Sequence, residues 1–269
     1  MAKAAESKNE SVLPHGSLSS FLEWNLGFGL LSRCVYRGQG CETWDLLPAV
    51  ARNEPKVDPK RTETELLEEF KLRLPSVHAG IFRNDWELLA LAQHHGAPTR
   101  FLDWTRSPLV ALWFAVSDRA RQENLPDCAV WVVETQSRDF VEEVELTKSP
   151  LLVSRTRLYE APHFDRRIAA QQGLFSIHKY WEAGAKVVSL DKNKGFRSRV
   201  RKLRIPSKFR TPLLKELESV GVNSASLFPD IAGLCRHVAI KHQLAPRFVL
   251  LSGSAEGGAF IDATLPSLR

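Results

Sequence analysis

The stretch LAQHHGAPTRFLDWTRSPLVALWFA, residues 91–115, decides how this chain is interpreted. It starts in one apolar helix and ends in another, and the segment between them is rich in hydrogen-bonding side chains: His94, His95, Thr99, Arg100, Asp103, Trp104 and Thr105. The second helix, capped by Ser107 and predicted to run to about Arg121, is apolar almost all round, which indicates a central position. A polar loop joined to a central helix lies near the core or in a cleft, where its side chains need partners.

Two interpretations of this polar block follow from the residues alone. Arg100 and Asp103 are close enough in sequence to form a pair, which Trp104 can cover. His94 and His95 stand in the last turn of a helix, where the helix dipole favours a protonated imidazole. The block is either a network that satisfies itself and fixes the loop, or a binding site whose ligand supplies the missing partners.

Length and composition predict a globular protein. The chain has 269 residues, of which 43% are hydrophobic, enough for a sizeable core. Its four cysteines are scattered without metal-ligand spacing, so we expect reduced thiols, a cytoplasmic location and no metal. No apolar run has the length of a membrane span, and no secretory signal is present at the N-terminus.

Hydrophobic periodicity and end signals predict helices early in the chain and strands later. The predicted helices cover residues 17–26, 62–77, 86–95, 107–121, 208–220 and 228–237. The predicted strands cover residues 34–38, 129–134, 185–190, 197–205 and 248–252, and residues 136–162 read as loops with one short strand. Without regular βαβ alternation, this order favours an α+β fold. We expect a flexible tail over residues 1–15 and one domain over residues 16–269.

Positive charge is concentrated in one segment. The net charge is +6, yet residues 192–215 contain no acidic residue at all. Strand alternation over RSRVRKLRI would place Arg197, Arg199 and Arg201 on one face, with Lys202 beside them, as a row that could follow a phosphate backbone. The alternative is a solvated strand edge whose charge prevents aggregation.

Several motifs together resemble the FRG domain family. They are Tyr36-Arg37-Gly38-Gln39, the block from Gln93 to Thr105 (QHHGAPTRFLDWT), Pro108 to Leu112 (PLVAL), Arg167 to Phe175 (RIAAQQGLF) and Leu227 to Asp230 (LFPD). The resemblance runs from about residue 36 to residue 242. The central block is long and unusual in composition, so it is a specific signal.

A weaker resemblance links the order of these motifs to ADP-ribosyltransferases, which implies an ADP-ribosyltransferase-like mixed sheet with surrounding helices and NAD as the substrate. By this resemblance the catalytic residues are Arg37, Thr99, Asp103 and Gln172. The NAD-binding residues are Arg37, Gly38, Gln39, His94, His95, Arg100, Trp104, Thr105 and Gln171. The sequence departs from ADP-ribosyltransferases at one point: Gln171 and Gln172 stand where those enzymes carry a glutamate. Asp103 could supply the negative charge instead.

The resemblance implies a toxin-like effector that acts in competition between bacteria or in defence against phages. We expect it to modify RNA or single-stranded DNA and to be neutralised by an antitoxin-type partner protein. A protein acceptor, a non-catalytic module that binds a nucleotide or nucleic acid, and a nuclease using His94 or His95 as acid and base remain alternatives. On the enzyme hypothesis, we expect six residues to meet in one cleft: Arg37, Thr99, Arg100, Asp103, Trp104 and Gln172.

Overall fold

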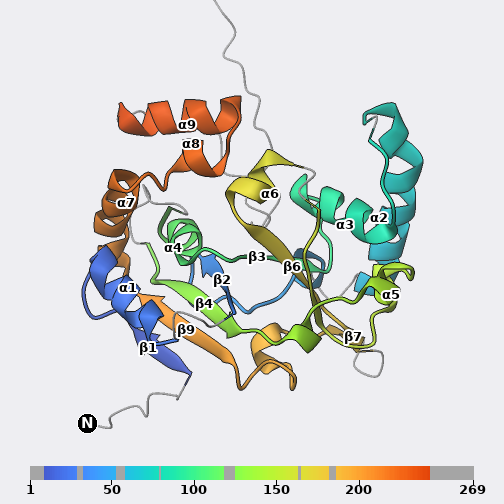
Figure 1. Ribbon diagram of the computed structural model, residues 1–269, viewed down its shortest axis with the longest axis horizontal. Coiled ribbons are helices and arrows are strands. Elements are labelled where there is room, and N and C mark those ends of the chain that lie inside the picture. The colour runs from blue at the N-terminus through green and yellow to red at the C-terminus, as the bar shows by residue number, and fades with distance from the viewer. Residues whose placement is uncertain are drawn as a thin grey trace, which may run out of the picture.

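A seven-stranded mixed sheet forms the centre of the described part of the chain in this computed structural model (Figure 1). The structure describes residues 9–28, 33–52, 58–78, 80–117, 125–162, 165–181 and 186–242. In spatial order the strands are β1 (Glu10–Val12), β9 (Val200–Ile205), β4 (Cys128–Glu134), β2 (Cys34–Gln39), β3 (Phe101–Thr105), β6 (Gly173–Ile177) and β5 (Arg157–Tyr159). A separate hairpin joins β7 (Tyr180–Trp181) to β8 (Lys186–Val187).

Neighbouring strands of the large sheet are antiparallel except at one edge, where β1 runs parallel to β9. Glu10 stands opposite Lys202 there, and Leu13 just after β1 is buried. The segment expected to be a flexible tail therefore includes an ordered edge strand. Its short, polar sequence gave no period-two signal, and its position depends on the pairing with β9.

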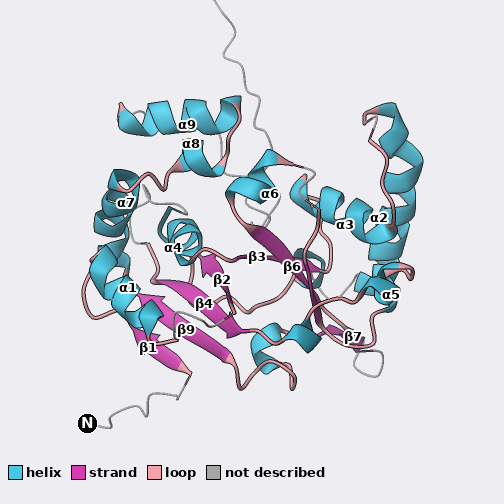
Figure 2. Cartoon of the chain, viewed as in Figure 1, coloured by secondary structure: helices cyan, strands magenta, loops and turns pink. Residues whose placement is uncertain are grey.

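Two groups of helices cover the same face of this sheet (Figure 2). The first group packs on β2, β4 and β9 and consists of α1 (Leu18–Leu26), α4 (Pro108–Ser117) and α7 (Arg210–Ser219). The second packs on β3, β6 and β5 and consists of α2 (Pro59–Arg73) and α3 (Asp85–His94). Tyr36 in the first cluster stands opposite Thr105, and Phe101 in the second cluster lies on the same side of β3 as Thr105.

The opposite face of the sheet is covered by loops and short turns. Leu102, Trp104 and Trp131 point to that face and pack against Leu46 and Phe196 from irregular segments. The remaining helices are α5 (Glu143–Leu146), α6 (Arg166–Ala170), α8 (Ser224–Leu227) and α9 (Ile231–Lys241). No helix among the described residues is long and apolar enough to cross a lipid bilayer.

This architecture confirms the α+β prediction, and several helix ends follow the expected signals. The Asn84 side chain accepts a hydrogen bond from the backbone of Glu87 and caps α3, and Gly96 follows the helix with φ 89°. Ser107 caps α4 in the same way. Gly221 follows α7 with φ 84°, as its sequence predicts.

Several predicted elements differ. The polar loop expected before the helix that begins at Pro108 contains strand β3, and the helix expected over residues 228–237 begins only at Ile231 and ends at Lys241. The strand expected from Arg197 begins only at Val200, because backbone bonds close turns over residues 193–199. The strand expected over residues 185–190 is reduced to β8, and residues 190–192 form a 3₁₀ turn. The predicted strand over residues 248–252 lies outside the described residues.

A buried chain of hydrogen bonds holds β3 to β6. The Trp104 indole donates to the Ser176 hydroxyl (2.9 Å), whose oxygen lies 2.9 Å from Nε2 of His178. Nδ1 of His178 lies 3.1 Å from the carbonyl oxygen of Val188. The chain is complete when His178 is neutral, with Nδ1 donating and Nε2 accepting. Burial lowers the pKa of His178 to about 4.

We expect His178 to make the fold sensitive to acid. Its folded pKa lies below its ordinary value of 6.5, so between these values the unfolded chain takes up a proton that the folded protein excludes. Stability from this residue is full above pH 6.5 and falls by up to about 1.4 kcal/mol per pH unit as the pH drops towards 4. Urea unfolding of the wild type and of His178→Gln at several pH values measures this. The variant should show a flatter pH dependence, and equal slopes would contradict the assignment.

Candidate functional site

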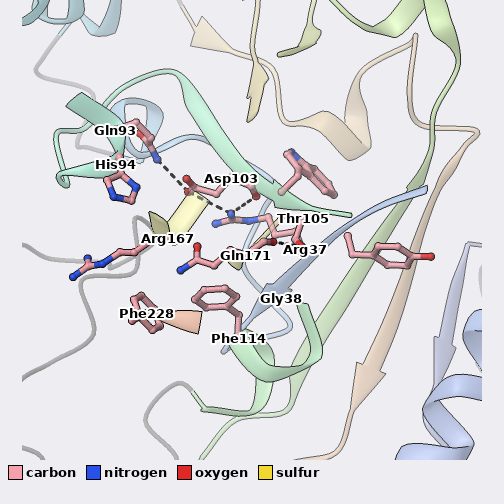
Figure 3. A pocket seen from close by; sticks show the side chains of 12 residues that line it. Arg37, Gly38, Gln93, His94, Asp103, Thr105, Phe114, Arg167, Gln171 and Phe228 are labelled. Atoms are coloured by element: carbon pink, nitrogen blue, oxygen red, sulfur yellow. Dashed lines mark hydrogen bonds and ion pairs between the residues drawn. The ribbon is translucent and has the colours of Figure 1, made fainter. Parts of the chain in front are cut away.

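The main candidate site is a pocket in the gap between the two helix groups. It encloses about 100 Å³ and is open to solvent. Its floor comes from β2 and β3, and its walls come from the end of α3, from α4, from α6 and from Phe228 after α8 (Figure 3). The lining residues are Tyr36, Arg37, Gly38, Gln93, His94, Asp103, Trp104, Thr105, Phe114, Arg167, Gln171 and Phe228.

The pocket lies where the ladder between β2 and β3 stops. The two strands share a single register pair, Tyr36 with Thr105. Beyond it, Nη1 of Arg37 donates to the backbone carbonyl of Asp103 at 2.6 Å and so bridges the two strands. One arginine side chain therefore replaces the next link of the ladder and is held at the floor of the pocket.

Arg37 is the most unusual group of the site. Its side chain is only 5% exposed, and burial lowers its pKa to about 10, although the carboxylate of Asp103 opposes this shift. The guanidinium therefore stays charged at neutral pH. Its Nε and Nη2 atoms are buried and have no hydrogen-bond partner in the structure. Buried donors of this kind are rare and cost about 1–3 kcal/mol each when unpaired, so they indicate a missing acceptor.

Asp103 lies beside Arg37 and is the one carboxylate among the described residues that line the pocket. Its Oδ2 atom is 3.7 Å from Nη1 of Arg37 and accepts a hydrogen bond from Nε2 of Gln93 at 3.1 Å. The side chain is 40% exposed on the pocket side. Its pKa is nevertheless raised, because desolvation by the surrounding walls outweighs the attraction of Arg37.

Thr99 does not reach the pocket but fixes a residue that does. It is fully buried, and its hydroxyl donates to Oε1 of Gln93 at 2.8 Å while accepting from the backbone of Phe101. Gln93 is thereby oriented with its amide nitrogen towards Asp103. The structure assigns Thr99 to a supporting position rather than to the catalytic position expected from the sequence.

The expected pair of Arg100 and Asp103 is wrong. Arg100 is 1% exposed and pairs through Nε with the equally buried Glu63 of α2, whose other oxygen accepts from the Arg100 backbone. Arg100 lies before β3, out of reach of the pocket side of the strand. Trp104 does not cover the pair either, because strand alternation turns its indole to the opposite face, towards Ser176. It borders the pocket without pointing its ring at Asp103.

Gly38 borders the pocket for reasons of packing. A Cβ atom there would lie 2.0 Å from the carbonyl oxygen of Ala111 in α4. The missing side chain thus lets α4 lie directly on β2 and places Phe114 over the pocket. Its neighbour Gln39 is absent from the pocket: its amide bonds to the Trp131 indole and the Asp45 carbonyl, so the NAD-binding role expected for it is not supported.

Two further predicted residues are held by backbone groups. The Thr105 hydroxyl donates to the carbonyl oxygen of Gln171 at 2.6 Å, and Nε2 of Gln171 donates to the carbonyl of Leu227 at 3.0 Å. Both residues line the pocket and tie its walls together. Gln172 does not line it, contrary to expectation, because it turns the chain out of α6 with φ 48°.

The two histidines differ in position. Nε2 of His94 lies 3.2 Å from Oδ1 of Asp165, and burial lowers the pKa of His94 more than this carboxylate raises it. The expectation of a protonated imidazole at the helix end is therefore wrong for His94. His95 is exposed at the end of α3, packs edge-on against His94 and does not line the pocket.

The basic segment does not form the expected row of arginines. Arg197 and Arg199 precede β9, and Arg199 pairs with Asp139 at 2.6 Å. Lys202 pairs with Glu10 at 3.1 Å, and Arg201 bonds to backbone carbonyls of residues 198 and 200. Acidic residues distant in sequence thus neutralise charges that look unpaired in the sequence.

Sequence reasoning missed five pocket residues: Tyr36, Gln93, Phe114, Arg167 and Phe228. Gln93 stood inside the central motif, but its role needs the bonds to Thr99 and Asp103. Phe114 and Phe228 look like ordinary core residues in the sequence. No group of three or more His, Cys, Asp or Glu side chains among the described residues is placed to hold a metal ion.

Comparison with known families identifies the part of the chain that carries the pocket floor. Residues 32–124 match the family model of the FRG domain. The chain contains an FRG domain. Neither the curated proteins nor the solved structures include a match to the chain.

The FRG match covers the first part of the resemblance expected over residues 36–242. It contains Arg37, Gly38 and Asp103, together with the α3 and α4 walls of the pocket. Arg167, Gln171 and Phe228 come from outside the matched residues, as do β4, β6 and β9 of the same sheet. The pocket on the FRG domain is thus completed by later segments of the chain.

Proposed function

We propose that this chain is an NAD-dependent ADP-ribosyltransferase that uses the pocket on its FRG domain. The reaction would break the bond between the nicotinamide nitrogen and C1′ of the ribose, and an acceptor oxygen or nitrogen would form a new bond to C1′. Nicotinamide and the acceptor's proton would leave. The observation that carries the proposal is the buried Arg37 guanidinium, with two unpaired donors, next to Asp103 in an open pocket.

The two charged groups suit this chemistry. A planar guanidinium donates to two oxygens at once, so the free edge of Arg37 can hold ribose hydroxyls or a phosphate. As the glycosidic bond breaks, positive charge develops on the ribose, and a carboxylate already oriented by Gln93 stabilises it without reorganisation. Asp103 would therefore take the part played by the glutamate in the enzymes that the sequence resembles.

The size of the pocket limits which part of NAD enters it. A cavity of about 100 Å³ is smaller than the roughly 300–1,000 Å³ typical of small-molecule sites. One ring or one sugar fits, and the rest of a dinucleotide would lie across the open rim. Phe114 and Phe228 supply apolar surface beside the charged floor.

A nucleic-acid acceptor and a neutralising partner protein remain parts of the proposal. The ion pairs of Arg199 and Lys202 leave less free charge for a phosphate backbone than the sequence suggests. A protein acceptor is therefore an equal outcome of the test. If the enzyme modifies components of its own cell, the producing cell needs a partner that silences it.

A second candidate is a non-catalytic module that binds a nucleotide. It is favoured by one observation: Gln171, in the motif RIAAQQGLF, donates to the backbone carbonyl of Leu227 and carries no charge. In that case Arg37 would hold a phosphate and no bond would break.

Incubation with NAD labelled in its adenine part separates the two candidates. We expect the wild type to release nicotinamide and to transfer label to RNA, single-stranded DNA or protein. Arg37→Ala should be folded and inactive, and Arg73→Gln, a substitution at an exposed site at the end of α2, should be active. Binding of NAD without nicotinamide release would establish the binding module instead.

A further inference from the structure

A pair of arginines stands at the rim of the pocket, on the ring of Phe228. The guanidinium carbon of Arg167 lies 5.5 Å from the centroid of that ring, and that of Arg236 in α9 lies 5.3 Å from it. Phe228 and Arg167 both line the pocket. Figure 3 shows Arg167 on the side of the pocket opposite to Arg37, with Gln171 between them. Arg236 does not line the pocket itself but contacts the ring of Phe228, which does.

The carboxylate of Asp230 lies beside these two positive charges, and its oxygens already have partners. Oδ2 of Asp230 lies 2.5 Å from both Nε and Nη2 of Arg167. Oδ1 of the same residue accepts from the backbone of Gly233 at 2.9 Å and caps α9. Both oxygens of Asp230 thus have other partners.

Arg236 is left without an equivalent partner. Its Nε atom is buried and has no hydrogen-bond partner in the structure. Burial lowers the pKa of Arg236, the charge of Arg167 lowers it further, and Asp230 opposes both effects. A guanidinium that stays charged there lacks an acceptor, as Arg37 does on the other side of the pocket.

We propose that Arg236 and Arg167, stacked on Phe228, form an anion subsite for the diphosphate of a nucleotide whose ribosyl end reaches Arg37 and Asp103. This inference rests on the proposed function for the orientation of the ligand. The subsite itself rests on the unpaired donor of Arg236 and on the position of Arg236 beside Arg167 at the ring of Phe228. Phosphate oxygens fit a guanidinium fork because two parallel hydrogen bonds form at once.

In this assignment Arg37 and the two rim arginines, Arg167 and Arg236, bind different parts of the nucleotide. A ring or sugar fits the cavity at Arg37, while a diphosphate remains outside it, where the rim arginines lie. Arg37 then contacts the sugar, next to the carbon at which charge develops. Recognition of the nucleotide's charge falls mainly to Arg236, because Arg167 shares its own charge with Asp230.

Calorimetric titration with ADP and with adenosine tests the subsite without any need for turnover. The wild type should bind ADP more tightly than adenosine. Arg236→Gln should weaken ADP binding about tenfold or more and leave adenosine binding unchanged. Arg236→Lys, which keeps the charge and loses the fork, should show a smaller loss. Arg73→Gln serves as the matched control, since it removes an exposed arginine at the end of α2.

The outcomes separate this inference from the proposed function. No ADP binding by the wild type, equal ADP affinity of the wild type and Arg236→Gln, or an equal loss of adenosine affinity would each overturn the subsite. Nicotinamide release that depends on Arg37, with ADP binding indifferent to Arg236, would keep the enzyme and remove the subsite. Arg236-dependent ADP binding without nicotinamide release would keep the subsite and remove the enzyme. Thermal melts establish that each variant is folded.

Discussion

Asp103→Asn is expected to lower the rate of nicotinamide release at least about 100-fold while the protein stays folded, if the chain is the enzyme that we propose. The substitution keeps the shape of the side chain and removes the charge that would stabilise the developing cation. The amide can still bond to Gln93. Steady-state rates and a thermal melt of the same preparations measure the effect.

The pH dependence of the wild type supplies the control for this prediction. Desolvation raises the pKa of Asp103, so the carboxylate becomes protonated at a higher pH than an ordinary aspartate. Activity that needs the ionised form should fall as the pH is lowered through that raised value. The residual activity of Asp103→Asn should lack this acid limb. An active variant with the wild-type pH profile would exclude Asp103 from the reaction.

Glu63→Ala is expected to reduce the free energy of unfolding by about 3–5 kcal/mol, the largest stability effect that we foresee. The substitution leaves the Arg100 guanidinium buried without its carboxylate, since both side chains are 1% exposed. It also removes the acceptor of the Arg100 backbone N–H. Urea unfolding at neutral pH, compared with the wild type, measures the loss.

Asp103→Ala is the matched comparison for Glu63→Ala, because it removes a carboxylate next to the other buried arginine. Asp103 is 40% exposed, and Arg37 keeps its bond to the Asp103 backbone carbonyl in this variant. We therefore expect a smaller loss of stability than for Glu63→Ala. The reverse order would show that the contact between Arg37 and Asp103 contributes more to stability than the buried pair of Arg100 and Glu63.

Local sequence patterns predicted the helices and their ends better than they predicted which charged side chains pair with one another. The cap at Asn84, the stop at Gly96 and the apolar character of α4 each depend on residues near one another in sequence, so they could be read from it. The partner of Arg100 is 37 residues away in α2, where the sequence shows only one of several glutamates on a helix. No local pattern distinguishes Glu63 from its neighbours.

In the candidate site, too, individual residues were predicted from the sequence, but their long-range partners were not. The sequence identified Arg37 and Asp103, because polar signatures in apolar surroundings need shared partners. From the sequence, Arg199 and Lys202 were expected in an unpaired basic row. In the structure a turn brings Asp139 to Arg199, and the pairing of β1 with β9 brings Glu10 to Lys202. Sequence reasoning missed Phe228 and Arg236, whose importance depends on the packing of α9 against Phe228. Long-range pairing decides which charges remain available for a ligand.

Titration of the wild type and of Arg37→Ala with NAD tests the central claim most directly, namely that the unpaired donors of Arg37 bind the nucleotide. We predict binding to the wild type and a loss of about 100-fold in Arg37→Ala, because a charge-assisted fork is removed from a buried position. Arg37→Lys should recover only part of the affinity, since an ammonium group cannot replace both donors of the fork. Equal affinity of the wild type and a folded Arg37→Ala would contradict the account.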